Sequence, residues 1–398
     1  MICKITGEKI KPFMSFGKMP IANGFLKKKA FKKEFFFNLE VGFSKKLSLF
    51  QINDHPKPEQ MFNKNYPFFT GSSKGMVKHF KEYSNWIKKY YGKNLKYLLE
   101  IGSNDGTFLK NFNKKKIKVI GFEPSSNVAN ISKKKGIKTI NSFFNYNNVK
   151  NLKSLQKKIN VISAANVICH VPDLKNLIKA INFLLSDNGL FIFEEPYLGS
   201  MYEKVSYDQI YDEHIYIFSV SSVNKIFKNF GFQLIDAIPQ STHGGSMRYV
   251  VSRKGVNKVQ NTIEKLIKKE KVKNIDNLKG CIKFKTNCEK SKKKLLKSIK
   301  KYKKNNKIIA GYGATSKSTT ILNYCGINHK DVKFICDTTP EKIGKYTPGT
   351  HIPIVSMKHF YSNLPDSIFL FAWNHKKEIF RKEKKIIKRA KWFAHVNI

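Results

Sequence analysis

The chain has 398 residues, of which 41% are hydrophobic and 13% aromatic, enough for two or three domains with apolar cores. Its formal net charge is +47 at pH 7, and the lysines that carry most of it are spread over the whole chain. A nucleic-acid site usually gathers its cations on one face or tail, so this spread favours a solvated lysine-rich surface and argues against nucleic acid as a partner. The charge should still attract anionic ligands such as sugar diphosphates.

Local sequence features place the chain among cytoplasmic proteins. No apolar run approaches the roughly 18 residues that a membrane span needs, so we expect no membrane insertion. The N-terminal sequence MICKITGEKIK lacks the apolar region of a secretory signal. The six cysteines show no paired spacing, which suits a reducing compartment. The oligomeric state stays open.

Residues 1–70 predict a small N-terminal module that is rich in Phe and Lys and has a strand-like segment over residues 35–43. Residues 74–92 predict a helix that leads into the next domain, because apolar side chains recur there at helical spacing. These side chains are Met76, Phe80, Tyr83, Trp86 and Ile87.

The most informative segment is LLEIGSNDGTF at residues 98–108, an apolar strand followed by a Gly-rich turn. A second strand over 118–122 ends in Glu123, the layout of a nucleoside-binding β-α-β unit in which an acid holds two ribose hydroxyls. The turn lacks the G-x-G-x-x-G of NAD sites and carries an acid, which favours S-adenosylmethionine, whose cationic tail benefits from nearby carboxylates. Four turn residues are expected to contact the cofactor: Gly102, Asn104, Asp105 and Gly106.

The rest of this domain, assigned to residues 71–254, alternates strands with helices. Strands are predicted near 161–165 and 190–193, and a helix over 174–186 lies between them. Alternation of this kind predicts a doubly wound parallel sheet.

Residues 255–305 predict a strongly basic helical connector. Two apolar stripes support it: Val256, Val259, Ile263 and Ile267, and then Leu295, Ile299 and Tyr302. Cys281 and Cys288 are seven residues apart on one face, where small core residues are expected rather than metal ligands.

Residues 306–398 predict a second, smaller α/β domain of Rossmann-like type. KIIAGYGATSKSTTILNYCGI indicates strand, turn and helix, and KFICDTTPEKIG indicates a strand that ends at Asp337. The turn is neither a dinucleotide nor a Walker loop, so a domain that binds a diphosphate at a helix N-terminus fits better. The natural phosphate donors are Lys317, Ser318 and Thr319.

Three polar clusters lie beyond the predicted strand ends, where α/β proteins place their sites. AANVICHVPD contains Asn166 and His170, YDQIYDEH ends in His214, and STHGGSMR contains His243. Histidine suits proton abstraction because its pKa of about 6.5 lies near working pH. Methylation of carbon requires such a base beside a carbonyl that stabilises the enolate. In EEPY at 194–197, Glu194 and Glu195 stand where a nucleic-acid amino methyltransferase would use an amide and a proline.

Ten sequence blocks, in order and nearly end to end, make the chain similar to the sugar-nucleotide C-methyltransferases of the dTDP-4-keto-hexose C-3 methyltransferase (tetronitrose) type. The blocks are FGKMPIANGFL, EIGSNDG, GFEPSSNVA, AANVICHVPD, EEPYLG, YDQIYDEH, HGGSMRY, GYGATSKSTTILNYCGI, CDTTPEKIGKYTPGTHIPI and FAWNH. The resemblance implies a three-domain enzyme whose middle domain binds S-adenosylmethionine, while the outer domains close over a 4-keto sugar nucleotide.

The resemblance also implies roles for individual residues. His214 stands at the position of the general base, and four further residues match catalytic positions of the family: Tyr66, His170, Tyr211 and Glu213. The expected cofactor contacts are completed by Ser142, Phe143 and Asn166. The expected substrate contacts are His243, Gly244, Lys317 and Asn374.

Two departures from the family pattern stand out. The family's N-terminal module binds zinc through two C-x-x-C pairs, but the four positions here are Cys3, Thr6, Ser44 and Leu47. Structural zinc needs four ligands, so we predict a module without metal, held by the Phe residues at 35–37 and 43. Ser142 also stands where an acid often contacts the adenine amino group.

The sequence therefore predicts an S-adenosylmethionine-dependent C-methyltransferase that acts at C-3 of a nucleotide-linked 4-keto sugar. An O- or N-methyltransferase of a glycan precursor is one alternative. An NAD-dependent sugar-nucleotide oxidoreductase that uses GYGATSK, or a non-catalytic sugar-nucleotide-binding protein, is another. The retained Tyr211, Glu213 and His214 argue against a mere binding protein. The sugar, the nucleotide and the C-3 substituent stay open.

Overall fold

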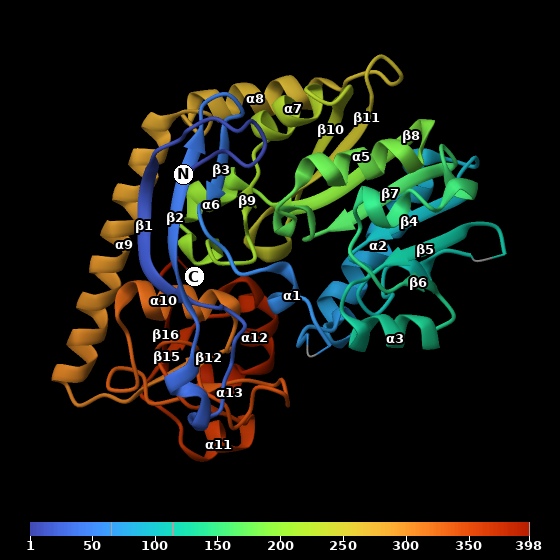
Figure 1. The fold of residues 1–398 in the computed structure, drawn as a ribbon. Helices are drawn as coiled ribbons and strands as arrows, with labels where there is room; N and C mark the ends of the chain where they lie inside the picture. The colour runs from blue at the N-terminus through green and yellow to red at the C-terminus, as the bar shows by residue number, and fades with distance from the viewer. Residues whose placement is uncertain (65, 114, 398) are drawn as a thin grey trace.

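The structure, a computed structural model, describes residues 1–64, 66–113 and 115–397. The described residues form three β-sheets with helices packed around them (Figure 1). Within the described residues, no helix is both long enough and apolar enough to cross a membrane.

The first sheet is antiparallel and joins the N-terminal module to the central part of the chain. Its order is β1 (Pro12–Pro20), β2 (Phe36–Ser44), β3 (Leu49–Ile52) and β9 (Tyr216–Ile217). The strand-like segment expected over 35–43 corresponds to β2. The last strand is contributed by the central part of the chain, with Ile217 opposite Phe50.

The central sheet has seven strands in the described chain, and helices cover both of its faces. The order is β10 (Phe232–Gln240), β11 (Ser246–Arg253), β8 (Leu185–Pro196), β7 (Ile159–Ala165), β4 (Tyr97–Ile101), β5 (Lys118–Phe122) and β6 (Lys138–Ile140). The five strands from β8 to β6 are parallel, as expected, but β11 is antiparallel to both its neighbours. Only residues 241–245 connect β10 with β11, and so short a connection permits only an antiparallel pair.

Consecutive residues of β4 face opposite layers of helices. Leu98 packs in a cluster with Phe80, whereas Leu99 packs in a separate cluster with Ile181. Ser73 caps the first of these helices by accepting a hydrogen bond from the Met76 amide. The helices of this domain are α2 (Lys74–Tyr91), α3 (Ser126–Lys134), α4 (Tyr146–Val149), α5 (Leu174–Leu184), α6 (Leu198–Lys204) and α7 (Val220–Lys228); α1 (Pro58–Met61) precedes them.

Two basic helices, α8 (Asn261–Val272) and α9 (Leu278–Lys304), follow the central sheet, and the second runs beside β1 (Figure 1). The expected stripe was wrong at its start: Val256 and Val259 are 41% and 43% exposed and precede α8. Gly255, at φ +80°, turns the chain after β11 and delays the helix. Of the other expected core residues, Ile267 and Tyr302 are half-buried, and five are buried: Ile263, Cys281, Cys288, Leu295 and Ile299.

The third sheet is fully parallel and has the predicted strand-turn-helix at its centre. Its order is β14 (Ile354–Val355), β13 (Ile335–Cys336), β12 (Ile309–Tyr312), β15 (Ser367–Leu370) and β16 (Lys391–Phe393). Its helices are α10 (Ser316–Cys325), α11 (Met357–Ser362), α12 (Lys376–Lys382) and α13 (Lys384–Ile387). Thr315 caps α10 by accepting a hydrogen bond from the Ser318 amide at 3.1 Å.

Protein hydrogen bonds hold the two turns where the zinc pairs would stand. The Thr6 amide donates to Cys3 Sγ at 3.5 Å, and the Leu47 amide donates to Ser44 Oγ at 3.3 Å. The Ser44 hydroxyl donates in turn to the Glu8 carboxylate. With one thiol among the four ligand positions, these residues do not fit tetrahedral zinc.

Two of the Phe residues expected to hold this module do so, and two do not. Phe37 and Phe43 are buried, but Phe35 and Phe36 are exposed. Successive side chains of a strand point to opposite faces, so Phe36 faces away from the core that its neighbour Phe37 enters.

We expect this module to be stable without metal. Ser44→Ala removes both the bond to the charged Glu8 and the acceptor of the Leu47 amide, so the free energy of unfolding should fall by about 1.5–3 kcal/mol. Ser15→Ala, at an exposed position of β1 where the hydroxyl accepts only an exposed bond from the Gly17 amide, is the control, with a change within about 0.5 kcal/mol. Denaturant unfolding with and without chelator measures both effects. One tightly bound zinc per chain, or a chelator-dependent loss of stability, would contradict the prediction.

Candidate functional site

A cavity of about 1160 Å³ opens at the carboxyl ends of strands from both α/β sheets. Gly102, Glu123 and Asn166 follow β4, β5 and β7 and line it. Gly313 and Asp337 follow β12 and β13 and line it from the other side. The carboxyl ends of the strands of both sheets therefore face the cavity, so it lies between two turns of the kind that bind nucleotides in α/β proteins.

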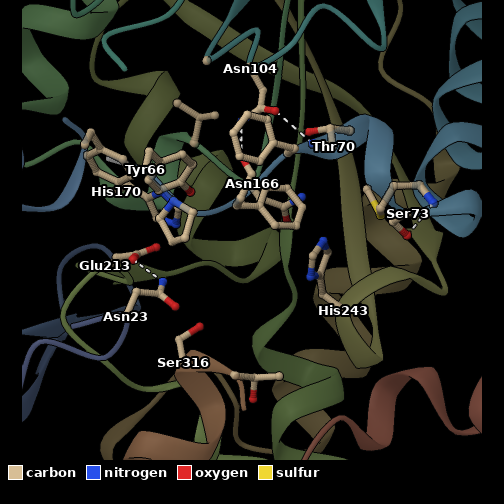
Figure 2. Close-up of a pocket in the computed structure, with 18 of the residues that line it drawn as sticks. Asn23, Tyr66, Thr70, Ser73, Asn104, Asn166, His170, Glu213, His243 and Ser316 are labelled. Carbon is tan, nitrogen blue, oxygen red and sulfur yellow. Dashed lines mark hydrogen bonds between the residues drawn. The ribbon is translucent and has the colours of Figure 1, made fainter. Parts of the chain in front are cut away.

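Most residues predicted for the site line this cavity (Figure 2). They are Tyr66, Gly102, Asn104, Glu123, Phe143, Asn166, His170, Tyr211, Glu213, His214, His243, Lys317 and Asn374. Four others are not among the described lining residues: Asp105, Gly106, Ser142 and Gly244.

Glu123 is the buried acid at the tip of β5. Its carboxylate accepts hydrogen bonds from the Asn104 amide at 2.9 Å and the Ser125 amide at 2.8 Å. Burial raises the pKa of Glu123, and these two amide bonds oppose the rise. Each carboxylate oxygen keeps a further lone pair, so the group is braced and still able to accept a ligand's hydroxyls.

The turn after β4 approaches the loop after β7 closely. Gly102 has φ +66°, and a Cβ there would clash with the Val167 side chain. Any side chain would therefore push the two loops apart and would also be strained by the backbone conformation.

The sequence interpretation overlooked Glu100, the only acid in β4. It is buried, and its Oε2 has no hydrogen-bond partner among the described residues. Burial, and then the charges of Glu123 and Asp105, raise the pKa of Glu100 well above its usual value. A carboxyl group inside an otherwise apolar strand was the signal that could have identified it.

The expected cofactor contact of Asp105 is corrected by its partners. Its carboxylate accepts hydrogen bonds from the Thr107 hydroxyl at 2.7 Å and the Gly71 amide at 3.1 Å, and lies 3.2 Å from Lys135 Nζ. These partners turn it away from the cavity. Asp105 is thus a structural residue that ties the turn to the chain around Gly71.

Local packing explains the other three residues that lie outside the cavity. A Cβ at Gly106 would clash with Ile137, so this glycine closes the turn against the core. The Ser142 hydroxyl donates to the carbonyl of Phe143 at 3.0 Å. Gly244 packs under the Trp373 ring, and Lys204 binds its carbonyl.

Asn104 fastens the segment that carries Tyr66 over the cavity. Its Oδ1 accepts from the Thr70 amide at 2.9 Å and its Nδ2 donates to the Phe68 carbonyl at 3.1 Å (Figure 2). Asn127 Nδ2 donates to the carbonyl of Tyr66 itself at 2.9 Å. Asn104 therefore bonds Glu123 through its amide and holds the segment that carries Tyr66 through its side chain.

His214 is held as a neutral imidazole with a defined tautomer. Its Nδ1 lies 2.6 Å from the Gln209 carbonyl oxygen, which can only accept, so Nδ1 carries the proton. Its Nε2 lies 2.9 Å from the Tyr211 hydroxyl and presents a lone pair. Burial, and then the nearby His170, lower the pKa of His214 well below 6.5. Burial lowers the pKa of His170 to about 4.

The N-terminal module fixes the two acids next to His214. Asn23 Nδ2 donates to Glu213 at 2.6 Å (Figure 2), and the Ala22 amide donates to Asp212 at 2.9 Å. Burial raises the pKa of both acids, and the charge of Glu213 raises that of Asp212 further. Both carboxyl groups thus depend on partners from outside the central domain.

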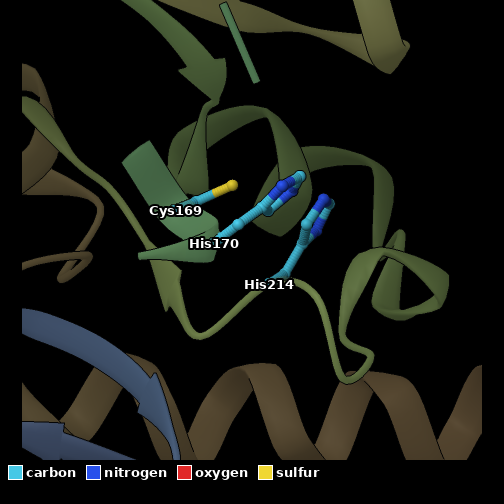
Figure 3. A group of neighbouring side chains, drawn as sticks. All are labelled: Cys169, His170 and His214. Carbon is cyan, nitrogen blue, oxygen red and sulfur yellow. The ribbon is translucent and has the colours of Figure 1, made fainter. Parts of the chain in front are cut away.

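Cys169, His170 and His214 point toward one another from two loops (Figure 3), with their ligand atoms within 4.8 Å. Burial and the neighbouring Glu195 raise the pKa of the Cys169 thiol well above 9, which keeps it protonated and a poor metal ligand. Both ring nitrogens of His214 already have partners. The group is better suited to hold and move a proton than to hold a metal ion.

Glu194 and Glu195 are structural supports behind the site. One oxygen of Glu195 accepts from the amides of the loop that carries His170, including Ile168 at 2.6 Å. Glu194 binds His79 Nε2 at 2.6 Å and Arg248 Nε at 2.7 Å. Burial raises the pKa of Glu195 to about 7.

Asp337 repeats the geometry of Glu123 in the C-terminal sheet. Its carboxylate accepts from the Ala314 amide, in the turn after β12, and from the Thr339 amide, both at 2.8 Å. Each acid therefore bonds the turn after the neighbouring strand and the amide two residues further along. The cavity ends in two matched nucleoside-type clamps.

Two of the three expected phosphate donors are occupied elsewhere. The Ser318 hydroxyl donates to the Thr315 carbonyl at 2.5 Å, within the helix cap, and the Thr319 hydroxyl donates to the Ala22 carbonyl at 2.8 Å. Lys317 is the exception: it lines the cavity, and its Nζ lies 3.4 Å from the His243 carbonyl oxygen. Burial lowers the pKa of His243 to about 3, so it is neutral beside this lysine.

Comparison with known families agrees with the three-part architecture. Domain models match three consecutive segments: a "Putative zinc binding domain" at residues 3–62, a "Methyltransferase domain" at 77–237 and a "C-methyltransferase C-terminal domain" at 241–396. The C-methyltransferase NovU of Streptomyces niveus is 25% identical over 389 residues, which is 97% of this chain and 92% of that protein.

Similar solved structures cover less than half of the chain. Magnesium protoporphyrin IX methyltransferase from Synechocystis PCC 6803, with bound S-adenosylmethionine, is 14% identical over 45% of this chain and 80% of its own, with a TM-score of 0.34. An S-adenosylmethionine-dependent methyltransferase from Clostridium acetobutylicum ATCC 824 is 14% identical over 45% of this chain and 92% of its own, with a TM-score of 0.36.

We expect His214 to remain the neutral Nδ1–H tautomer at pH values where a free histidine is protonated, because burial and the Gln209 carbonyl favour that form. Histidine-selective ¹⁵N NMR, with His214→Asn to assign the signal, should show titration only well below pH 6.5. Below pH 6.5 a histidine in the unfolded chain takes up a proton, whereas His214 in the folded protein does not. The free energy of unfolding should therefore decrease as the pH is lowered below 6.5. Titration at pH 6.5 or above would contradict the assignment.

Proposed function

The chain is an S-adenosylmethionine-dependent C-methyltransferase, and we propose that it methylates C-3 of a nucleotide-linked 4-keto sugar with His214 as the base. One observation carries the proposal: a neutral histidine, whose Nε2 lone pair faces the Tyr211 hydroxyl, stands in the cavity between two nucleoside-type clamps. One clamp suits the methyl donor and the other suits the substrate's nucleotide.

The residues around Glu123 fit S-adenosylmethionine. Glu123 would receive the ribose hydroxyls, and Phe143 would lie against the adenine. The buried Asn166 Oδ1, which has no partner among the described residues, suits a cationic tail. When bound, the cofactor supplies an electrophilic methyl group on a sulfonium.

The C-terminal half of the cavity suits a nucleoside diphosphate. Asp337 would receive the second ribose, while Lys317 and the N-terminus of α10 would face the diphosphate. Asn374 and His243 lie between this half and the histidines. The cavity of about 1160 Å³ exceeds the roughly 300–1,000 Å³ usual for one small ligand, as a site for two nucleotides should.

The proposed reaction begins at the substrate carbon. His214 Nε2 takes the C-3 proton, and the electrons of the broken C–H bond move to the 4-keto oxygen as an enolate. His170, whose Nε2 has no partner among the described residues, would donate a hydrogen bond to that oxygen. C-3 would then be ready to take the methyl group that the bound cofactor supplies, while the electrons of the methyl–sulfur bond would go to sulfur, which leaves as a neutral thioether. Tyr211 would orient the base, and Tyr66 and Glu213 would shape the sugar site.

The alternatives predict different behaviour. An O- or N-methyltransferase would need little more than positioning, and the His214–Tyr211 pair would have no proton to remove from carbon. The match to methyltransferase models leaves the NAD-dependent oxidoreductase and the mere binding protein without support. A cytoplasmic location, and the lack of nucleic-acid and membrane partners, stay predictions.

Glu123→Gln should weaken S-adenosylmethionine binding by about tenfold to a hundredfold, because an amide offers one acceptor where the carboxylate offers two, and the charge is lost. Isothermal titration measures the dissociation constant. Glu341→Gln removes the same charge from the far end of the cavity and should leave the affinity unchanged. Equal affinities for the wild-type and Glu123→Gln proteins would remove Glu123 from the cofactor site.

His214→Asn should lower methyl transfer by about 10²–10⁴-fold and leave cofactor affinity nearly intact, because it removes only the base. Mass spectrometry of incubations with dTDP-, GDP- and CDP-linked keto sugars, watching for donor-dependent gain of one methyl group, identifies the substrate. The wild-type protein should also exchange the C-3 hydrogen with deuterated water. Normal turnover by His214→Asn, or methylation without any C-3 exchange, would refute the proposed chemistry.

A further inference from the structure

The base-bearing loop, residues 206–215, carries a buried acid that the proposed reaction does not use. Asp208 has no exposed surface and is not among the described residues that line the cavity. It lies in the interface with the C-terminal sheet, on the opposite side of the loop from Tyr211 and His214. A buried carboxylate is costly unless partners compensate it, so its surroundings need an explanation.

The partners of Asp208 come from the C-terminal sheet. Trp373 Nε1 donates a hydrogen bond to Asp208 Oδ2 at 2.6 Å, and His395 Nε2 lies 3.2 Å from Oδ1. Burial raises the pKa of Asp208, but His395 and Lys317 more than reverse this, so the pKa falls below its usual value and the group is ionised. Two residues that follow different strands thus hold one carboxylate.

Other residues of the C-terminal domain also contact the base-bearing loop. The Thr320 hydroxyl on α10 donates to the carbonyl of Ile210 at 3.0 Å. The Trp373 ring fills the space over Gly244 and lies under Lys317 Nζ, at 5.3 Å from the ring centroid. Trp373 therefore contacts the loop, the turn that carries His243 and a substrate-facing lysine.

The hydrogen bond that sets the tautomer of His214 is made by the residue next to Asp208. The carbonyl that accepts from His214 Nδ1 belongs to Gln209, the neighbour of Asp208. A shift of Asp208 would move that carbonyl, and with it the direction of the Nε2 lone pair. Misplacement of a catalytic group by about 1 Å can cost on the order of a hundredfold in rate.

We propose that Trp373 and Asp208 are positioning residues for the base, so that the C-terminal domain aligns His214 as well as contacting the substrate. The inference rests on the proposed function, because it takes His214 as the group that removes the proton. Neither residue touches the reacting atoms. Their effect passes through the backbone of Gln209, and it joins nucleotide binding on one domain to proton abstraction on another.

Trp373→Phe tests this directly, because it removes the indole N–H and keeps an aromatic ring over Gly244. Wash-out of the substrate's C-3 hydrogen and kcat should both fall on the order of tenfold to a hundredfold, while S-adenosylmethionine affinity stays unchanged. Trp392→Phe is the matched control: it lies on β16 of the same sheet, and its Nε1 has no hydrogen-bond partner among the described residues. It should behave as the wild-type protein.

Asp208→Asn provides a second test if Trp373→Phe does not fold, and should lower C-3 exchange by a similar factor because it removes the charge that His395 and Lys317 face. The His214 ¹⁵N signal should also shift in both variants and not in Trp392→Phe. C-3 exchange at the wild-type rate in either folded variant would overturn the inference. Full turnover by His214→Asn would instead remove the proposed base itself, so the two failures are distinguishable.

Discussion

Three buried acids in one short loop depend on hydrogen bonds from other parts of the chain. Asp208, Asp212 and Glu213 lie within six residues, and none finds its main partner in its own domain. The C-terminal sheet supplies Trp373 and His395 to the first, and the N-terminal module supplies the amide of Ala22 and the side chain of Asn23 to the other two. An unpaired buried carboxylate costs several kcal/mol, so the base-bearing loop is fully stable only when all three parts are assembled around it.

This constraint explains why the site can use a neutral histidine. A base buried among ionised acids would have its pKa raised, yet burial raises the pKa of Asp212 and Glu213, and Asp208 is turned away from the cavity. Burial lowers the pKa of His214, and the nearby His170 and Lys317 lower it further. The loop thus keeps its acidic groups on protein partners, while His214 Nε2 faces the Tyr211 hydroxyl. On either side of the cavity, Glu123 and Asp337 brace matching turns.

Local patterns predicted the elements of the fold, but pairings between distant segments lay beyond them. The sequence predicted β4, β5 and α2 nearly residue for residue, from the apolar runs at 98–101 and 118–122 and the helical spacing over 74–92. These elements could be predicted because the spacing of apolar residues along the sequence reflects which face of a strand or helix is buried. No local signal indicates that β9 completes the N-terminal sheet. At the site, the residues expected from sequence include Glu123 and His214, which line the cavity, and Asp105, which does not, while Glu100 was overlooked. Only the fold decides which acid near a turn bonds the backbone and which faces the cavity.

The N-terminal module in turn depends on contacts with the central domain for its stability. Zinc would hold such a module by itself, because metal binding supplies folding free energy within the module. Hydrogen bonds of Ser44 and Glu8 supply less, so the module gains the rest from its neighbours: β3 pairs with β9, and the Ile52 amide donates to the carbonyl of Ile215 at 2.9 Å. Ile215 directly follows His214. A module with one thiol among its four ligand positions thus pairs with the loop that carries His214, and the bonds that stabilise the module also hold that loop.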